Sequence, residues 1–254
     1  MQPTTRRSFL RTIPAAGALA SQLRILRAQS EAEQAGRLSA RPSSSAASAP
    51  PGLRPLGLRA DRDALLYIPE SASKYEQAPL IVSLHGATRN ADRAIDLFRS
   101  LSDEHGFLLL APASAGRTWD AMEGTLGPDV AFINRSLAKT FELRKIDPKR
   151  IAMAGFSDGA SYSLSLGLAN GDLFRAVFGF SPGFIFPAEF RGKPPVFISH
   201  GRQDQILPIE ECSRVIVPRL KQLGYNVTYR EFEGKHALPP DIAAEAIRWF
   251  MEMA

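Results

Sequence analysis

Short apolar runs alternate with amphipathic stretches along most of the chain beyond residue 56. Runs such as LIVSL at 80–84 and FLLLA at 107–111 are continuously apolar, which is typical of strands buried on both faces. The expected strands are 64–68, 80–84, 107–111, 150–155, 176–180, 196–199 and 227–232. The expected helices are 90–105, 130–143, 161–169, 209–223 and a last one around 242–250. This order predicts an α/β fold, with a mostly parallel central sheet and helices on both faces.

The first residues show a different pattern, which resembles a twin-arginine export signal. Arg6 and Arg7 precede the sequence SFLR and a weakly apolar stretch at 13–20, as in signals of that route. The apolar stretch is far shorter than the ~20 residues that cross a bilayer, so no stable membrane span is expected. We therefore predict a signal segment at 1–28 and export, by the twin-arginine route, to the periplasm or the extracellular space.

Residues 29–55 are rich in Ser, Ala, Pro and Arg and have no apolar periodicity. Such a composition does not build a core, so we predict a disordered linker at 29–55 and one catalytic domain at 56–254. The domain is expected to fold without residues 1–55.

Charge and cysteine content narrow the class of protein. The formal net charge is +5, but residues 1–55 carry +6 and the remainder −1, so nothing in the body favours a nucleic-acid partner. Cys212 is the only cysteine, which excludes an intramolecular disulfide and fits a cytoplasmic protein or one exported already folded. A packing role is expected for its side chain.

The candidate nucleophile is Ser157 in the sequence GFSDG at 155–159, which matches the pattern G-x-S-x-G. It lies between an expected strand and an expected helix, where a sharp turn would expose the serine hydroxyl. Gly155 and Gly159 are expected to be glycines because a side chain at either position would crowd that turn.

The candidate general base is His236, between the last strand and the last helix. A carboxylate that orients it should follow a strand between Ser157 and His236, and Asp204 fits that position. Glu231, inside the last strand, and Asp172, after the helix that follows the serine, are the rival acids.

The other three histidines receive no catalytic role. His105 precedes a glycine at a helix end, and His85 and His200 precede glycines at strand ends. We expect His85 to brace the loop that follows it. That loop should supply an oxyanion donor from Ala87, with Thr88 as the alternative, beside the backbone N–H of Asp158.

Aromatic residues after two strands are candidates for the substrate pocket. Trp119 follows the strand at 107–111, and Phe184, Ile185 and Phe186 follow the strand at 176–180. Ordinary core packing is an equally good interpretation for each of them.

These motifs together resemble the bacterial phospholipase/carboxylesterase branch of the α/β-hydrolases, and more loosely the polyhydroxybutyrate-depolymerase-like and feruloyl-esterase-like enzymes. The similar pieces are LIVSLHGAT, AGFSDGASYSLSLGLANGDLF, SPGF, FISHGRQDQILP and GKHALPP, within residues 78–240. The resemblance implies a cofactor-independent serine esterase that acts on a small-molecule ester through an acyl-enzyme. Asp158 and Ala160 replace a glutamine and a glycine that are common in that branch, which leaves the substrate class open.

Three alternatives remain at this stage: an acyltransferase, a peptidase with the same triad, or a non-catalytic binding protein on a hydrolase scaffold. No His, Cys or Asp cluster has the spacing of metal ligands, and no glycine-rich phosphate loop follows a strand. We therefore expect neither a metal nor a cofactor. The oligomeric state is not predictable from these features.

Overall fold

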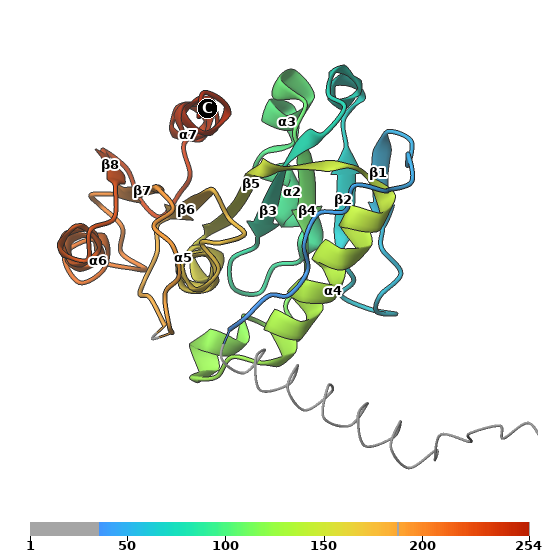
Figure 1. Ribbon diagram of the computed structural model, residues 1–254. Coiled ribbons are helices and arrows are strands. Elements are labelled where there is room, and N and C mark those ends of the chain that lie inside the picture. Colours follow the sequence, from blue (N-terminus) through green and yellow to red (C-terminus); the bar gives the residue numbers. More distant parts are fainter. Residues whose placement is uncertain (1–35, 187, 254) are drawn as a thin grey trace, which may run out of the picture.

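A computed structural model describes residues 36–186 and 188–253 (Figure 1). Its strands are β1 (Gly52–Pro55), β2 (Leu65–Ile68), β3 (Ala78–Leu84), β4 (Leu108–Ala111), β5 (Ile146–Phe156), β6 (Ala176–Phe180), β7 (Val196–Gly201) and β8 (Val227–Phe232). Its α-helices are α2 (Ala91–Asp96), α3 (Arg99–His105), α4 (Pro128–Leu143), α5 (Asp158–Ala169), α6 (Ser213–Gln222) and α7 (Pro240–Met251). Short 3-10 turns lie at Glu70–Lys74 and Asp120–Glu123.

The eight strands form one sheet in the order β1-β2-β4-β3-β5-β6-β7-β8. Six neighbouring strands are parallel to one another, namely β4, β3, β5, β6, β7 and β8. In contrast, β2 is antiparallel to both β1 and β4. The predicted mostly parallel sheet is confirmed. Because parallel strands end at the same edge, the loops after β3, β5, β7 and β8 meet there.

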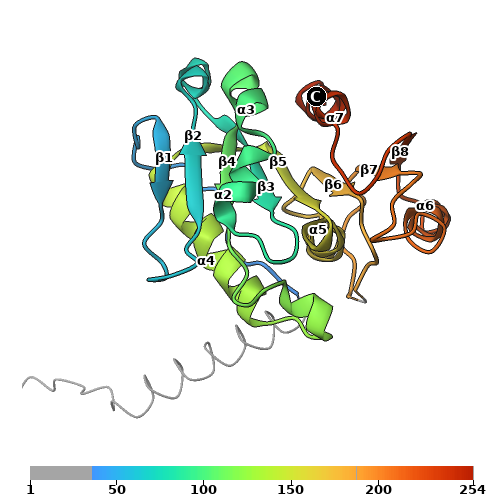
Figure 2. The same cartoon turned by 180° about the vertical axis from the view of Figure 1, so that it is seen from behind.

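Helices cover both faces of the sheet, as Figures 1 and 2 show from opposite sides. Successive residues of a strand point to opposite faces, so Leu80 and Val82 of β3 join one buried cluster and Ile81 joins the other. The first cluster includes side chains of α4, α5 and α6, and the second includes side chains of α2 and α7. Both faces are thus buried, which explains why the strands read as continuous apolar runs.

The predicted helix at 90–105 is two short helices, α2 and α3. The break falls at Phe98, whose φ of −134° is not helical. Its ring is fully buried and lies 5.8 Å from the ring of Phe180 on β6. The chain therefore changes direction between α2 and α3 at the residue whose ring packs on the sheet.

Residues 36–51, which we call the N-terminal strap, pack on the body of the protein. Leu38, Ala40 and Ala49 are buried in the same cluster as α4 and α5. Beyond the strap, β1 pairs with β2, with Leu53 opposite Tyr67. The prediction of a disordered linker is therefore wrong for residues 36–55, and the packed body begins before residue 56.

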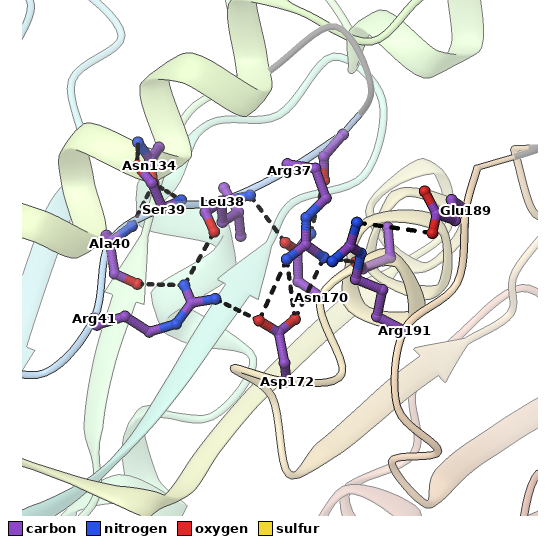
Figure 3. Close-up of polar contacts among 12 residues, drawn as sticks. Arg37, Leu38, Ser39, Ala40, Arg41, Asn134, Asn170, Asp172, Glu189 and Arg191 are labelled. Atoms are coloured by element: carbon purple, nitrogen blue, oxygen red, sulfur yellow. Dashed lines mark hydrogen bonds and ion pairs between the residues drawn. The ribbon is translucent and has the colours of Figure 1, made fainter. Parts of the chain in front are cut away.

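Side-chain amides hold the strap in place (Figure 3). The buried Asn170 accepts from Leu38 N–H at 2.9 Å and donates to the carbonyls of Gly36 and Leu166, both at 2.8 Å. Asn134 of α4 accepts from the backbone N–H groups of residues 39 and 40 at 2.8 and 2.9 Å. The strap is thus held by polar contacts between residues more than 90 positions apart in the sequence. It has no regular apolar pattern from which its packing could be predicted.

The predicted signal segment at 1–28 and residues 29–35 of the predicted linker lie outside the described residues. Within the part of the chain that the structure describes, no helix is both long and apolar enough to cross a bilayer.

Candidate active site

Ser157 lies on a strained turn between β5 and α5. Its φ of 58° and ψ of −123° are values that a residue with a side chain rarely adopts. The turn is held by Ser157 N–H, which donates to Phe180 O at 2.9 Å. Ser157 therefore stands at the carboxyl edge of the sheet, where the pattern G-x-S-x-G predicts it.

The two glycines of that pattern permit the turn. A Cβ on Gly155 would lie 2.0 Å from Gly159 O, and a Cβ on Gly159 would lie 2.4 Å from Leu84 O. Either contact is impossible for real atoms, so the expected reason for both glycines agrees with the packing.

His236 and Asp204 lie side by side at the same edge of the sheet. His236 Nδ1 is 2.6 Å from Asp204 Oδ2, a distance typical of a charge-assisted hydrogen bond. The ring of Phe156, next to Ser157, lies 4.8 Å from the imidazole of His236. The imidazole is thus oriented on one side by a carboxylate and on another by an aromatic ring.

Asp204 is buried and its carboxylate is well supplied with donors. Oδ1 accepts from Ile206 N–H and Leu207 N–H, both at 2.9 Å. Burial raises the pKa of Asp204, but the hydrogen bonds from Leu207, His236 and Ile206 outweigh burial, and the net pKa lies below its ordinary value. The carboxylate is therefore ionised at neutral pH, as the partner of an imidazolium must be.

A second imidazole contacts the same carboxylate. His200 is fully buried, and its Nε2 lies 2.8 Å from Leu207 O and 3.2 Å from Asp204 Oδ2. Its Nδ1 lies 2.6 Å from Ser213 Oγ, so Nδ1 accepts when Nε2 carries the proton. Burial lowers the pKa of His200, which favours this neutral form. Sequence reasoning gave His200 no role, although its position four residues before Asp204 was a usable signal.

The two rival acids are engaged elsewhere. Asp172 forms ion pairs with Arg37 at 3.3 Å and Arg41 at 2.5 Å in the N-terminal strap. Glu231 pairs with Arg202 and Arg214, and its hydrogen bond with Arg214 is the main cause that lowers its pKa to about 2. Neither carboxylate is the one that contacts His236.

One cavity of about 540 Å³ contains both proposed catalytic side chains. Ser157 and His236 line it together with Ala87, Thr88 and Ile206. The cavity opens at the carboxyl edge of the sheet, so the residues predicted to act on a substrate share one accessible space.

Existing hydrogen bonds show which of the predicted N–H groups are free to bind an oxyanion. Thr88 N–H donates to Arg117 O at 2.7 Å, so the alternative that assigned a donor to Thr88 is wrong. Among residues 36–186 and 188–253, nothing accepts from the N–H groups of Ala87 and Asp158. These two donors remain the predicted oxyanion hole.

His85 braces the oxyanion loop, as expected, through both ring nitrogens. Nδ1 lies 2.8 Å from Gly86 O, and Nε2 accepts from Ser114 N–H at 3.0 Å. Burial lowers the pKa of His85 to about 4, so the ring is neutral and cannot donate at Nε2.

Trp119 does not line the cavity, contrary to the pocket prediction. It is fully buried, stacks on Tyr162 with 5.0 Å between ring centroids, and donates from Nε1 to His85 O at 2.9 Å. Tyr162 donates in turn to the buried carboxylate of Asp120 at 2.8 Å. Trp119 therefore stabilises the loop that begins at His85 and Gly86, through its hydrogen bond to His85 O.

Phe184 and Phe186 are wrongly predicted for the same pocket. They line a separate hollow of about 190 Å³ beside α6, shared with Val215. Gly183 N–H donates to Ser161 Oγ at 2.9 Å, which ties the loop after β6 to α5 and directs these rings away from the cavity at Ser157.

The sequence predicts neither a metal nor a cofactor, and that remains a prediction. Within the described residues, no three His, Cys, Asp or Glu side chains lie close enough together to hold a metal ion.

Comparison with known proteins agrees with the resemblance drawn from the motifs. Residues 130–253 match the family described as phospholipase/carboxylesterase. An acyl-protein thioesterase 1 from Emericella nidulans is 31% identical over 134 residues, which are 46% of this chain and 56% of that protein. A probable feruloyl esterase C from Aspergillus niger is 27% identical over 158 residues, which are 59% of this chain and 57% of that protein. The chain thus spans little more than half the length of these curated relatives.

Solved structures share the fold. The crystal structure of esterase PE8 superimposes with a TM-score of 0.61 at 22% identity, covering 74% of this chain and 97% of that one. A carboxylesterase from Bacillus cereus superimposes with a TM-score of 0.56 at 18% identity, covering 74% of this chain and 92% of that one. The α/β-hydrolase fold predicted from the motifs is confirmed.

Proposed function

We propose that this protein, which has the α/β-hydrolase fold and matches the phospholipase/carboxylesterase family over residues 130–253, is a serine hydrolase of carboxylic esters. The observation that carries the proposal is one arrangement of three residues. Ser157, on its strained turn, lines the same cavity as His236, and His236 is hydrogen-bonded to the buried Asp204 at 2.6 Å.

The arrangement supports acylation of the serine. His236 Nε2 takes the proton of Ser157 Oγ as that oxygen attacks the ester carbonyl, while Asp204 holds the Nδ1 proton and stabilises the imidazolium. The N–H groups of Ala87 and Asp158 stabilise the oxyanion. Collapse of the tetrahedral intermediate breaks the C–O bond of the ester, and His236 protonates the departing alkoxide.

Deacylation repeats these steps with water. His236 removes a proton from the water that attacks the acyl-enzyme, and the proton returns to Ser157 Oγ when the carboxylic acid leaves. An alcohol or amine in place of water would make the protein an acyltransferase, and an amide substrate would make it a peptidase. The names of the relatives, an acyl-protein thioesterase and a feruloyl esterase, favour hydrolysis of an ester or thioester over these alternatives.

The test is turnover of p-nitrophenyl butyrate together with covalent labelling by a fluorophosphonate. Wild-type protein should release nitrophenolate and gain one label on Ser157, whereas Ser157→Ala should lose both because triad members contribute several orders of magnitude to turnover. Ser181→Ala is the matched control, since it removes a buried hydroxyl with no hydrogen-bond partner within the described residues. Labelling of Ser157→Ala at the wild-type level would refute the assignment, and wild-type protein inert towards every ester would favour a binding protein.

We also propose export of the folded protein by the twin-arginine route. Support comes from Arg6 and Arg7, from the SFLR sequence and weakly apolar stretch behind them, and from the single cysteine, which makes folding independent of disulfide formation. Replacing both arginines by lysine should leave the enzyme in the cytoplasm, as measured by fractionation of a producing cell. Undiminished activity outside the cytoplasm would show that the arginine pair is incidental.

A further inference from the structure

Three arginines stand at one side of the cavity that contains Ser157. Arg89 and Arg93 line the cavity itself, and together with Arg62 they line an adjoining hollow of about 360 Å³. Thr88, next to the predicted oxyanion donor Ala87, also lines both spaces. We call Arg62, Arg89 and Arg93 the arginine rim.

The charge of the rim is largely uncompensated. Within the described part of the chain, Arg62 and Arg89 form no ion pair, and Arg93 pairs with Asp96 at 3.2 Å in an exposed contact. The adjoining hollow is lined by the three arginines, Thr88 and Asn90, without a carboxylate. Asp96, the partner of Arg93, also lines the cavity that contains Ser157, so the uncompensated positive charge is concentrated in the adjoining hollow. A hollow lined by one sign of charge focuses the field of that charge on whatever enters it.

Arg62 is held in place before any ligand arrives. It sits in a turn at φ 48°, and its Nε donates to Ser114 O at 2.6 Å while Nη2 donates to Arg89 O at 3.1 Å and Ser114 Oγ at 3.0 Å. These bonds tie the loop at 62 to the loops at 89 and 114, and Ser114 contacts His85 in turn. A positioned guanidinium loses less freedom on binding an anion than one on a free side chain.

The field of the rim reaches the catalytic loop. Burial is the main cause of the lowered pKa of His85, and the positive charge of Arg62 lowers it further. Geometry links the rim to the reacting atoms more directly, because Arg89 and Arg93 line the same cavity as Ser157 and His236. An anion bound by these two arginines would therefore share one space with the group that Ser157 attacks.

We propose that the arginine rim binds an anionic group, such as a carboxylate, of the ester that Ser157 attacks. The inference rests on the proposed ester hydrolysis and narrows its substrate class to esters with a negative charge a few bonds from the scissile bond. Guanidinium groups suit this task because their paired N–H donors match the two oxygens of a carboxylate. The hollow beside α6 offers no such charge selection, because it is lined by Glu211 and Arg219 as well as by apolar side chains, and Ser157 does not line it.

The experiment compares matched anionic and neutral esters. In one arm, the p-nitrophenyl monoester of adipate is compared with p-nitrophenyl hexanoate, which places the charge on the acyl group. In the other arm, 4-carboxyphenyl butyrate is compared with phenyl butyrate, which places it on the alcohol. In one of the two arms the anionic ester should have the higher kcat/KM by about tenfold or more, equivalent to about 1.4 kcal/mol, and the ratio should fall as NaCl is raised.

The matched variants are Arg89→Gln and Arg175→Gln, which remove the same charge at opposite edges of the sheet. Arg175 directly precedes β6, so its loss should leave the anionic-to-neutral ratio unchanged, whereas Arg89→Gln should bring that ratio to about one. A ratio near one in both arms for wild-type protein, or a preference that survives in Arg89→Gln, would overturn the inference.

Calorimetric binding of adipate to Ser157→Ala separates this inference from the proposed function. Saturable binding that Arg89→Gln abolishes would support the rim even if no ester were hydrolysed. Turnover of neutral esters without adipate binding and without a charge preference would refute the rim and leave the esterase intact.

Discussion

Replacement of Asn170 by alanine tests whether the N-terminal strap contributes to the stability of the catalytic body. The side chain makes three hydrogen bonds, with Leu38 N–H at 2.9 Å and with the carbonyls of Gly36 and Leu166 at 2.8 Å, in a fully buried position. Each bond is worth ~1 kcal/mol net, and water cannot replace the lost partner at a buried site. Asn170→Ala should therefore lower the free energy of unfolding by about 3 kcal/mol and Tm by roughly 6 to 12 °C.

Asn134→Ala is the control. It also removes an amide that holds the strap, through Ser39 N–H and Ala40 N–H at 2.8 and 2.9 Å, but Asn134 is partly exposed and water can take its place. Its cost should be about 1 kcal/mol or less. Urea unfolding followed by tryptophan fluorescence measures both variants, since Trp119 is fully buried. Wild-type stability of Asn170→Ala, with unchanged denaturant dependence, would refute the view that the strap is part of the cooperative fold.

Three further results are expected. Asp204→Asn should keep the fold, as judged by circular dichroism, yet lower kcat for p-nitrophenyl butyrate by roughly 10⁴, because the amide favours the wrong tautomer of His236; a wild-type rate would show that another acid acts. The pKa of His85 is lowered by burial from 6.5 to about 4, so between these pH values the unfolded chain binds a proton that the folded chain does not, and stability falls as pH falls. In His85→Gln the amide can still accept from Ser114 N–H, so the loss of unfolding free energy between pH 6.5 and pH 4 should be smaller than in the wild-type protein by about 3 kcal/mol. Urea titrations at the two pH values measure this difference, and the same loss in both proteins would contradict the assignment. A chain that begins at Leu56 loses the strap and β1, so in thermal denaturation followed by circular dichroism it should melt at a clearly lower temperature than a chain that begins at residue 36, and equal melting temperatures would contradict a stabilising role of the strap.

The sheet and the three proposed catalytic residues were predictable because their signals are local. Continuous apolar runs mark strands that are buried on both faces, and Ser157 and Asp204 each follow such a run closely. His236 follows β8, an edge strand of mixed sequence (VTYREF), and its position between the last strand and the last helix is its signal. Parallel pairing then brings the ends of those strands to one edge without any further information from the sequence.

The N-terminal strap was missed because its contacts are non-local. Leu38 and Ala40 have strand spacing, but Pro42 and the serines that follow do not continue it. The strap is held by Asn134 and Asn170, whose amides look like ordinary helix-surface and helix-end residues in the sequence. Composition alone cannot distinguish a Ser/Ala/Pro-rich linker from a segment that lies extended on a surface and shares its hydrogen bonds.

The aromatic residues were misplaced for a related reason. An aromatic residue after a strand faces either the cavity or the core, and the polar contacts of its loop decide which. For Trp119 the deciding contact is the bond from its own Nε1 to His85 O. For Phe184 and Phe186 it is the attachment of their loop to α5 through Ser161 and Ser165.

The anchoring of Gly36 at Asn170 determines where anything joined to the amino-terminal side of the body is attached. Asn170 caps the end of α5, and Ser157 precedes the start of that helix, so the two points are separated by about 18 Å along a rigid axis. Anything linked ahead of Gly36 would thus be held near the C-terminal end of α5, away from the nucleophile at its N-terminal end. This applies to a surface tether, a fusion partner or a solid support. Immobilisation through that end should leave the mouth of the cavity facing solution, which makes it the favourable point of attachment for a working catalyst.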